Sequence, residues 1–150
     1  MAVERANPYA AFNFLVDLGT GDTASTKAGF QEVSGLNTDI TLADYRNGND
    51  KVNHVRKVST MYKVGDVTLK RGLIGTLDLW AWVAEARNGS QEPRNVTIQL
   101  MDETRENAVM TWRLLNVRPM KYTVPTFNGK TASDVAIEEL VLSCEDLLIE

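Results

Sequence analysis

GFQEVSGLNTDITLADYRNGND, residues Gly29 to Asp50, is the stretch around which the rest of the chain is organised. It contains two strand-like pieces, Phe30–Val33 and Leu36–Leu42. Ser34–Gly35 lies between them and indicates a bulge or a sharp bend. The stretch ends in a polar segment in which Asn47–Gly48 predicts a tight turn, because both residues tolerate positive φ at low cost.

The segment after the second piece, about Asp44–Asn53, has two interpretations. An exposed tip that carries Tyr45 and Arg46 is typical of a contact loop, because Tyr and Arg are enriched at protein interfaces. The same residues also fit an ordinary surface hairpin. The residues themselves leave both interpretations open, since loops carry function in many proteins but not in all of them.

Length and composition indicate one globular domain, residues 1–150. The chain is long enough to bury a core, and its 43% hydrophobic and 24% charged content is ordinary for such a domain. The formal net charge of −4 excludes a global field that would attract nucleic acid. Cys144 is the only cysteine, so an intrachain disulfide and a zinc-binding Cys cluster are both excluded.

The N-terminal residues MAVERANPYAAFNF contain no apolar run like that of a signal peptide. No window reaches the roughly 18 apolar residues that a membrane span needs. We therefore expect a protein that is made and folded in a cytoplasm without a signal peptide. If the protein leaves the cell, we expect another route.

Alternating apolar residues predict a mainly β domain. The pattern is clearest in Phe12–Leu18, Val96–Leu100 and Ala108–Val117, and the last two form a hairpin around the charged turn at residues 101–107. A further strand, Val135–Cys144, is apolar on both faces, so it lies centrally in a sheet or is covered by a partner. The periodicity of Val52–Tyr62 is unclear.

Thr76–Arg87, TLDLWAWVAEAR, is the one convincing helix. Thr76 can cap it, and Asn88–Gly89 suits its end. Apolar residues form two stripes on nearly opposite sides, namely Leu77, Trp80, Ala81 and Ala84, and Leu79, Trp82, Val83 and Ala86. A helix that is apolar nearly all round is buried on more than one side. Its second stripe is covered either by another subunit or by the chain's own loops.

The sequence indicates no catalytic, cofactor-binding or metal-binding site. His54 is the single histidine and lies beside two cationic residues, which disfavour both metal binding and general-base catalysis. Cys144 lies on an apolar strand and is expected to pack as a small hydrophobic residue. Glu138 and Glu139 are adjacent on a strand, so they point to opposite faces and cannot act as a carboxylate pair. A non-enzymatic domain is therefore expected.

Segments in order along nearly the whole chain resemble the inner-tube proteins of contractile phage tails and phage-tail-like injection systems. The family is related to the tube proteins of type VI secretion. The residues that carry the resemblance are Asn7-Pro8-Tyr9, Phe12, Phe14, Gly29-Phe30, Val33-Ser34-Gly35-Leu36, Tyr45-Arg46-Asn47-Gly48-Asn49-Asp50, Val67-Thr68-Leu69-Lys70-Arg71-Gly72, Leu79-Trp80-Ala81-Trp82, Val96, Leu100-Met101-Asp102, Thr111-Trp112-Arg113, Pro119, Lys121-Tyr122 and Ala136-Ile137-Glu138-Glu139-Leu140. The segment Ser59–Tyr62 departs from the family pattern, in which a Pro-Gly turn is frequent.

The resemblance implies a fold and an assembly. Each subunit is expected to be an antiparallel β-sandwich or part-barrel flanked by one α-helix, with an extended contact loop at about Asp44–Asn53. Six subunits would form a ring whose strands join into a continuous β-barrel that lines a lumen, and rings would stack into a tube. Ring closure would also cover exposed sheet edges.

The resemblance also implies which residues contact other subunits. In the loop these are Tyr45, Arg46, Asn47, Gly48, Asn49 and Asp50. In the helix they are Trp80, Trp82 and Val83. The lumen is expected to carry polar and charged side chains from alternating strand positions.

The implied function is that of the rigid inner tube of a contractile tail or injection system. A sheath protein would surround the tube and drive it through a target envelope. Further partners implied are a baseplate or tube initiator, a terminator or cap, and a tape-measure protein or effector cargo in the lumen. No cofactor is implied. The alternative is a ring-forming secreted carrier or chaperone for effectors, of the type VI tube kind.

Overall fold

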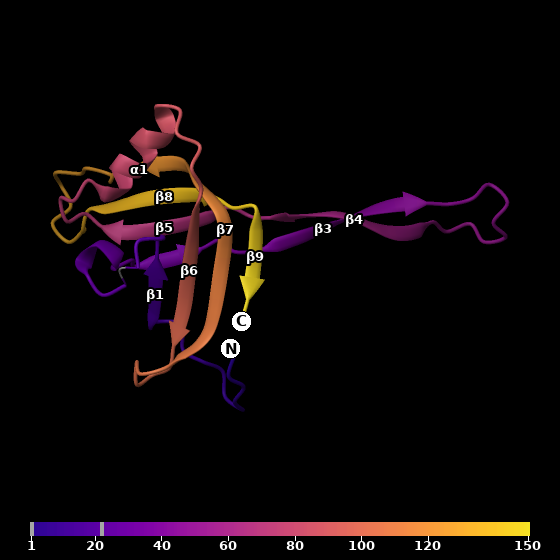
Figure 1. Ribbon diagram of the computed structural model, residues 1–150, viewed down its shortest axis with the longest axis horizontal. Coiled ribbons are helices and arrows are strands. Elements are labelled where there is room, and N and C mark those ends of the chain that lie inside the picture. The colour runs from indigo at the N-terminus through magenta and orange to yellow at the C-terminus, as the bar shows by residue number, and fades with distance from the viewer. Residues whose placement is uncertain (1, 22) are drawn as a thin grey trace.

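The long strand β7 (Ala108–Thr123) joins two sheets in this computed structural model, which describes residues 2–21 and 23–150. The first half of β7 pairs with β6 (Arg94–Met101) on one side and with β9 (Asp146–Ile149) on the other. Its second half pairs with β8 (Ile137–Ser143), and the register shifts between Pro119 and Lys121. A β-bulge of this kind bends a strand, and Figure 1 shows β7 curving from one sheet into the other.

The remaining strands extend the two sheets. β1 (Phe14–Asp17) pairs with β6, so the first sheet comprises β1, β6, β9 and the first half of β7. β5 (Val67–Gly72) pairs with β8, and β2 (Glu32–Ser34) pairs with β5. All of these pairings are antiparallel. A short 3-10 turn, η1 (Thr26–Ala28), precedes β2.

The core lies between the two sheets and the helix α1 (Asp78–Arg87). The alternation of burial along β5 and β8 explains why the core lies there, because every second residue of each strand is buried and its neighbours are half-buried. Leu79 and Trp82 of the helix join this cluster. The buried apolar members are Val16, Phe30, Val67, Leu69, Leu79, Trp82, Val96, Ile98, Leu114, Val117, Leu140, Leu142 and Cys144. No helix among the described residues is long and apolar enough to cross a membrane.

The architecture confirms the expected mainly β fold, the single helix and the hairpin around residues 101–107. The bend at Ser34–Gly35 is also confirmed. Gly35 has a φ of 89°, and a Cβ atom there would lie 2.4 Å from the backbone oxygen of Asp66. Only glycine fits this combination of left-handed backbone and close approach.

Three details differ from the expectations. Thr76 does not cap the helix; Leu77 occupies that position, and the Thr76 hydroxyl donates to Asp78 Oδ1 instead. Residues Arg56–Val64 form a strand, β4, where the periodicity was unclear, and its register with β3 shifts between Ile40 and Leu42. Strand β9 was missed, because four residues at the end of the chain carry too little pattern to identify a strand.

Candidate functional site

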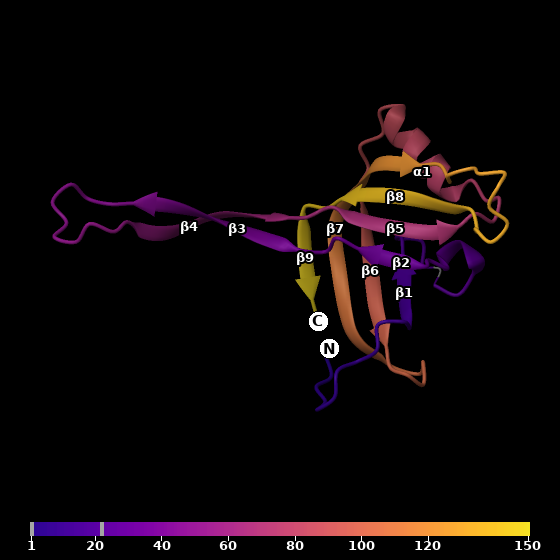
Figure 2. The same ribbon diagram turned by 180° about the vertical axis from the view of Figure 1, so that it is seen from behind.

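The most conspicuous feature is a two-stranded arm that projects from the body of the molecule (Figures 1 and 2). It consists of β3 (Thr38–Tyr45) and β4 (Arg56–Val64), which pair only with each other. All residues of the two strands except Val64 are exposed. At the base, the Tyr62 hydroxyl donates to Asp146 Oδ1 at 3.3 Å and so joins the arm to β9.

The arm carries apolar side chains that its own chain does not cover. They are Ile40, Leu42, Tyr45, Val58, Met61 and Tyr62, and each is between 46% and 73% exposed. The register places Ile40 and Tyr62 on one face of the ribbon and Val58 on the other, since directly paired residues share a face. A free two-stranded ribbon with uncovered apolar residues on both faces is only marginally stable in water. The arm is therefore suited to being covered on both faces by other chains.

The tip of the arm is held in shape by its own hydrogen bonds. The Arg46 guanidinium donates from Nε to the carbonyl of Val52 at 3.1 Å and from Nη2 to the carbonyl of Asp50 at 3.0 Å. The Asp50 amide donates to the Asn47 carbonyl at 3.1 Å, which confirms the predicted tight turn. In return, the Asn47 amide donates to Asp50 Oδ2 at 3.0 Å. Arg46 thus determines the path of the loop from inside it.

The arm and the body of the molecule carry opposite net charges. Residues 38–64 contain five Lys or Arg and three Asp, a formal net charge of +2, whereas the rest of the chain carries −6. Ion pairs within the arm join Lys57 to Asp44 and Arg56 to Asp50, while Lys51 at the tip has no charged partner within 4 Å among the described residues. A basic arm and an acidic body complement each other, which favours contact between copies of this chain.

The three helix residues expected at an interface lie in different environments. Trp80 is 41% exposed; its ring packs edge-on against Tyr122 at 5.8 Å, and the Arg87 guanidinium lies 5.4 Å above it. Val83 is half-buried. Trp82 is only 4% exposed and belongs to the chain's own core, which leaves little of its side chain for a contact with another subunit. The helix stripe that contains Trp82 is the one that the chain buries itself.

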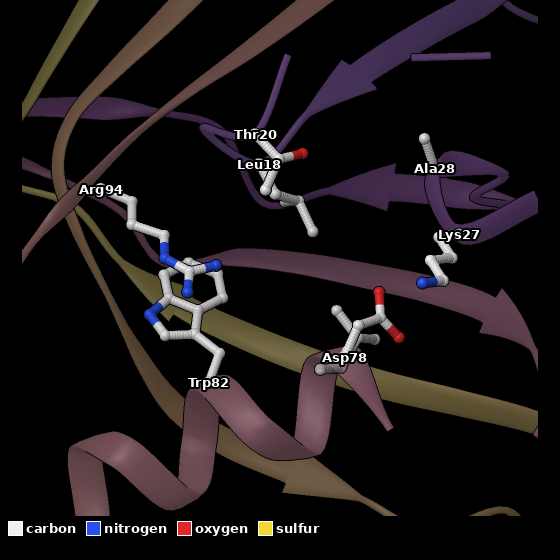
Figure 3. A pocket seen from close by; sticks show the side chains of 8 residues that line it. Leu18, Thr20, Lys27, Ala28, Asp78, Trp82 and Arg94 are labelled. Atoms are coloured by element: carbon white, nitrogen blue, oxygen red, sulfur yellow. The ribbon is translucent and has the colours of Figure 1, made fainter. Parts of the chain in front are cut away.

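A cavity of about 270 Å³ lies beside Trp82 (Figure 3). The guanidinium of Arg94 stacks over the Trp82 ring at 4.6 Å and forms one wall. The lining residues are Leu18, Thr20, Lys27, Ala28, Asp78, Leu79, Trp82 and Arg94. Three of these eight residues, Leu18, Leu79 and Trp82, belong to the core or pack against it, so the cavity lies at the open side of the helix–sheet contact.

A buried ion-pair network anchors the helix to the sheets, and sequence reasoning missed it. Arg71 on β5 and Glu138 on β8 are 1% and 2% exposed, and Arg71 Nη2 lies 2.6 Å from Glu138 Oε1. Arg71 also donates to both carboxylate oxygens of Asp78 at 3.0 and 2.9 Å, and to the carbonyl of Lys27 at 2.7 Å. The Tyr122 hydroxyl on β7 donates to Glu138 Oε2 at 2.5 Å.

The network shifts the pKa values of Asp78 and Tyr122. Burial disfavours the charged form of Asp78, but hydrogen bonds from Arg71 and Thr76 outweigh this effect and lower the pKa of Asp78 from its ordinary 3.8 to about 2. Burial, together with the hydrogen bond to Glu138, raises the pKa of Tyr122 to about 12. Asp78 therefore stays ionised and Tyr122 stays protonated over a wide pH range.

The candidate catalytic and metal-binding residues of the sequence lie at separate places in the fold. His54 lies exposed in the tip of the arm, and Cys144 is buried with its thiol 3.6 Å from the carbonyl oxygen of Gly65. Glu138 and Glu139 point to opposite faces of β8, as predicted, with Glu138 buried and Glu139 half-buried. Within residues 2–21 and 23–150, no group of three His, Cys, Asp or Glu residues is placed to hold a metal ion.

Comparisons with known proteins agree with this geometry. The family model described as T4-like virus tail tube protein gp19 matches residues 10–148. A chain in the PVC sheath–tube complex of an extracellular contractile injection system, in the extended state, is 25% identical. The match covers 95% of this chain and 91% of that chain, with a TM-score of 0.82.

Two further solved structures extend the comparison. A chain of the PVC sheath/tube terminator in the extended state is 26% identical, with 99% of both chains covered and a TM-score of 0.82. Hcp1 from Flavobacterium johnsoniae is 13% identical, with 91% of this chain and 93% of that chain covered and a TM-score of 0.55, which shows a shared fold alone. No curated protein matches the chain.

Proposed function

This chain belongs to the family of T4-like virus tail tube proteins, and we propose that its copies form six-membered rings which stack into the inner tube of a contractile injection system. The chain is a structural tube protein, and we propose a mechanical role for it rather than a catalytic one. Its similarity to a chain of the PVC sheath–tube complex supports a contractile system as the setting.

The projecting arm is the observation that carries the proposal. The arm has a positive net charge and carries exposed apolar side chains on both faces, and the body from which it projects has a negative net charge. An arm on one end of a chain that contacts the body of another copy makes a head-to-tail interface, which generates closed rings or open filaments. The proposed contact residues are Tyr45, Arg46, Asn47, Gly48, Asn49 and Asp50 of the tip, together with Trp80 and Val83 of the helix.

The proposed partners follow from the assembly. A sheath would surround the tube, and a baseplate or initiator and a terminator would define its ends. On contraction of the sheath, the tube would pass through a target envelope and conduct cargo or release a tape-measure protein. We propose that subunits assemble in the bacterial cytoplasm and act as part of an extracellular phage-tail-like particle. Many repeated interfaces of modest strength would make the tube stiff.

Negative-stain electron microscopy of the purified chain, with light scattering for its mass, tests the proposal. Rings or tubes with sixfold end views are expected. Tubes should also form when the chain is seeded with a tube initiator. Monomers that stay dispersed under both conditions would refute the proposed assembly. Free single rings that retain an effector protein and never stack would support the alternative role as an effector carrier.

Alanine at Arg46 separates assembly from folding. The variant loses two hydrogen bonds that shape the tip, each charge-assisted, but no core contact. We expect a soluble protein with an unchanged unfolding midpoint that needs at least about tenfold more protein to form tubes. Lys51→Ala is the matched control, because it removes a tip cation that makes no ion pair in the described structure. Equal tube formation by Arg46→Ala and wild type would contradict a role for the tip.

A further inference from the structure

The arm continues the ribbon that β2 and β5 form in the body of the molecule. In the body, Ser34 faces Thr68 across the ladder, and at the base of the arm Thr38 faces Val64. Three residues separate these two pairs on each strand, so the register is the same on both sides of the gap. The ladder itself is interrupted there, because β3 and β4 form a sheet of their own.

The gap between the two ladders brings the strands close together. We call this gap the joint; it comprises residues 35–37 and 65–67. Gly35 has a left-handed backbone with a φ of 89°, and a Cβ atom on it would lie 2.4 Å from the carbonyl oxygen of Asp66. A Cβ atom on Gly65 would lie 2.7 Å from both Cγ and Nδ2 of Asn37. Each strand therefore places a glycine against the other strand.

Contacts from the corner between β8 and β9 support the joint (Figures 1 and 2). The Gly65 amide donates to the Asn37 carbonyl at 2.9 Å, and the thiol of buried Cys144 lies 3.6 Å from the Gly65 carbonyl oxygen. Next to the joint, the Tyr62 hydroxyl donates to Asp146 Oδ1 at 3.3 Å. The base of the arm is thus in contact with a third part of the body, beyond β2 and β5.

The strands of the arm pair only with each other and, apart from Val64, lie exposed, so little packing against the body is left to set their direction. We infer that the joint fixes the direction of the arm before the subunit meets another copy, with Gly35 as the main positioning residue. A segment that already has its bound conformation loses less conformational freedom on docking, so it docks more tightly. This consequence for assembly rests on the proposed function, whereas the direction of the arm does not.

A small change of angle at the joint becomes a large displacement at the tip. The eight residues of β3 alone span about 25 Å, at about 3.3 Å per residue. A tilt of about 10° at the base would move the far end of β3 by roughly 4 Å. Donor–acceptor distances in hydrogen bonds vary by only about 0.5 Å, so contacts of the tip would be lost. The joint therefore controls contacts that are made far from it.

The two glycines of the joint differ in what an added methyl group would meet. At Gly35 the obstacle is backbone, and the left-handed φ is itself unfavourable for alanine, so the joint has to move. At Gly65 the obstacle is the side chain of Asn37, which is exposed and can turn into water. Gly35→Ala should therefore redirect the arm, and Gly65→Ala is its matched control.

The distance between two spin labels in the dispersed subunit tests the direction of the arm. Lys51→Cys carries one label at the tip, and Ala81→Cys carries the other on the exposed side of α1. Cys144 is buried, so the chain without these two substitutions gives the blank. With the wild-type joint we expect one narrow distribution of distances, which stays the same when labelled subunits are diluted into unlabelled tubes.

The variants of the joint are compared in the same labelled chain. Gly35→Ala should shift the mean distance by at least about 4 Å, or broaden the distribution by as much, and should need at least about tenfold more protein to form tubes. Gly65→Ala should match wild type in both measurements. Leu79→Ala, which opens the core at α1, should lower the urea midpoint and leave the distance unchanged.

The outcomes separate this inference from the proposed function. A broad distribution in the dispersed wild-type subunit, or equal distances in Gly35→Ala and Gly65→Ala, would overturn the inference and leave tube formation untouched. If Gly35→Ala does not fold, insertion of one glycine between Gly65 and Asp66 decides, because it makes the two sides of the joint unequal. A broadened distribution then supports the inference, and an unchanged one refutes it. Failure of the wild-type chain to form tubes would refute the proposed function alone.

Discussion

Replacing Arg71 with methionine should destabilise the fold far more than removing any surface cation. Methionine fills much of the same space but cannot donate hydrogen bonds. The substitution leaves the Glu138 carboxylate buried, at 2% exposure, without its cation. It also releases Asp78 at the start of α1 and the carbonyl of Lys27, so the helix loses its polar attachment to β5.

The magnitude follows from the burial of both partners. Removing one partner of a buried pair costs about 3–5 kcal/mol, because the remaining charge is stranded in a medium of low dielectric. That is a large fraction of the ~5–15 kcal/mol of a typical domain. For a chain of 150 residues it corresponds to a fall in melting temperature of about 6–20 °C.

Urea unfolding of the dispersed chain, followed by tryptophan fluorescence, measures the effect. Arg113→Met is the matched control, because Arg113 is 53% exposed and its ion pair with Glu150 spans 3.3 Å. An exposed pair of this kind contributes at most about 1 kcal/mol. The double variant Arg71→Met, Glu138→Leu removes both charges and should recover most of the lost stability, because an apolar replacement of a buried pair is often neutral.

Two results would refute the reasoning. The first is an Arg71→Met variant no less stable than Arg113→Met, which would mean that water or a rearranged side chain compensates the stranded Glu138. The second is a double variant as unstable as Arg71→Met alone. In that case the loss would come from packing or from the helix attachment, not from an unpaired buried charge.

Two further predictions concern the same scaffold. The folded state lowers the pKa of Asp78 from 3.8 to about 2, so the ionised Asp78 stabilises the fold above pH 4 and this stabilisation is lost as the pH falls towards 2. Asp78→Asn should therefore flatten the decline of the urea midpoint between pH 4 and pH 2. An unchanged slope of the midpoint against pH would contradict this prediction. Gly35→Ala should cost at least about 1–2 kcal/mol in urea unfolding, because the residue has a φ of 89° and its new Cβ would meet the Asp66 carbonyl oxygen at 2.4 Å, whereas Gly129→Ala, with open space around it, should be neutral. Equal midpoints for the two alanine variants would show that the bend relaxes without strain.

The sequence by itself determined the local elements and the family. Alternating apolar residues identified the strands around Val16, Ile98 and Leu114, and the pattern TLDLWAWVAEAR identified the helix within two residues at its start. These signals are short-range, because a strand or a helix imposes its period on neighbouring residues. The segments from Asn7 to Leu140 that resemble tail tube proteins also gave the family that the match over residues 10–148 shows.

Only the tertiary structure decided which surfaces are free and which charges are buried. The helix has two apolar stripes of similar composition, and packing against the sheets chose the one that contains Leu79 and Trp82. Arg71 and Glu138 are 67 residues apart, and each follows an ordinary strand pattern. Their pairing depends on the register of β5 against β8, which is a long-range property that no local window of sequence contains.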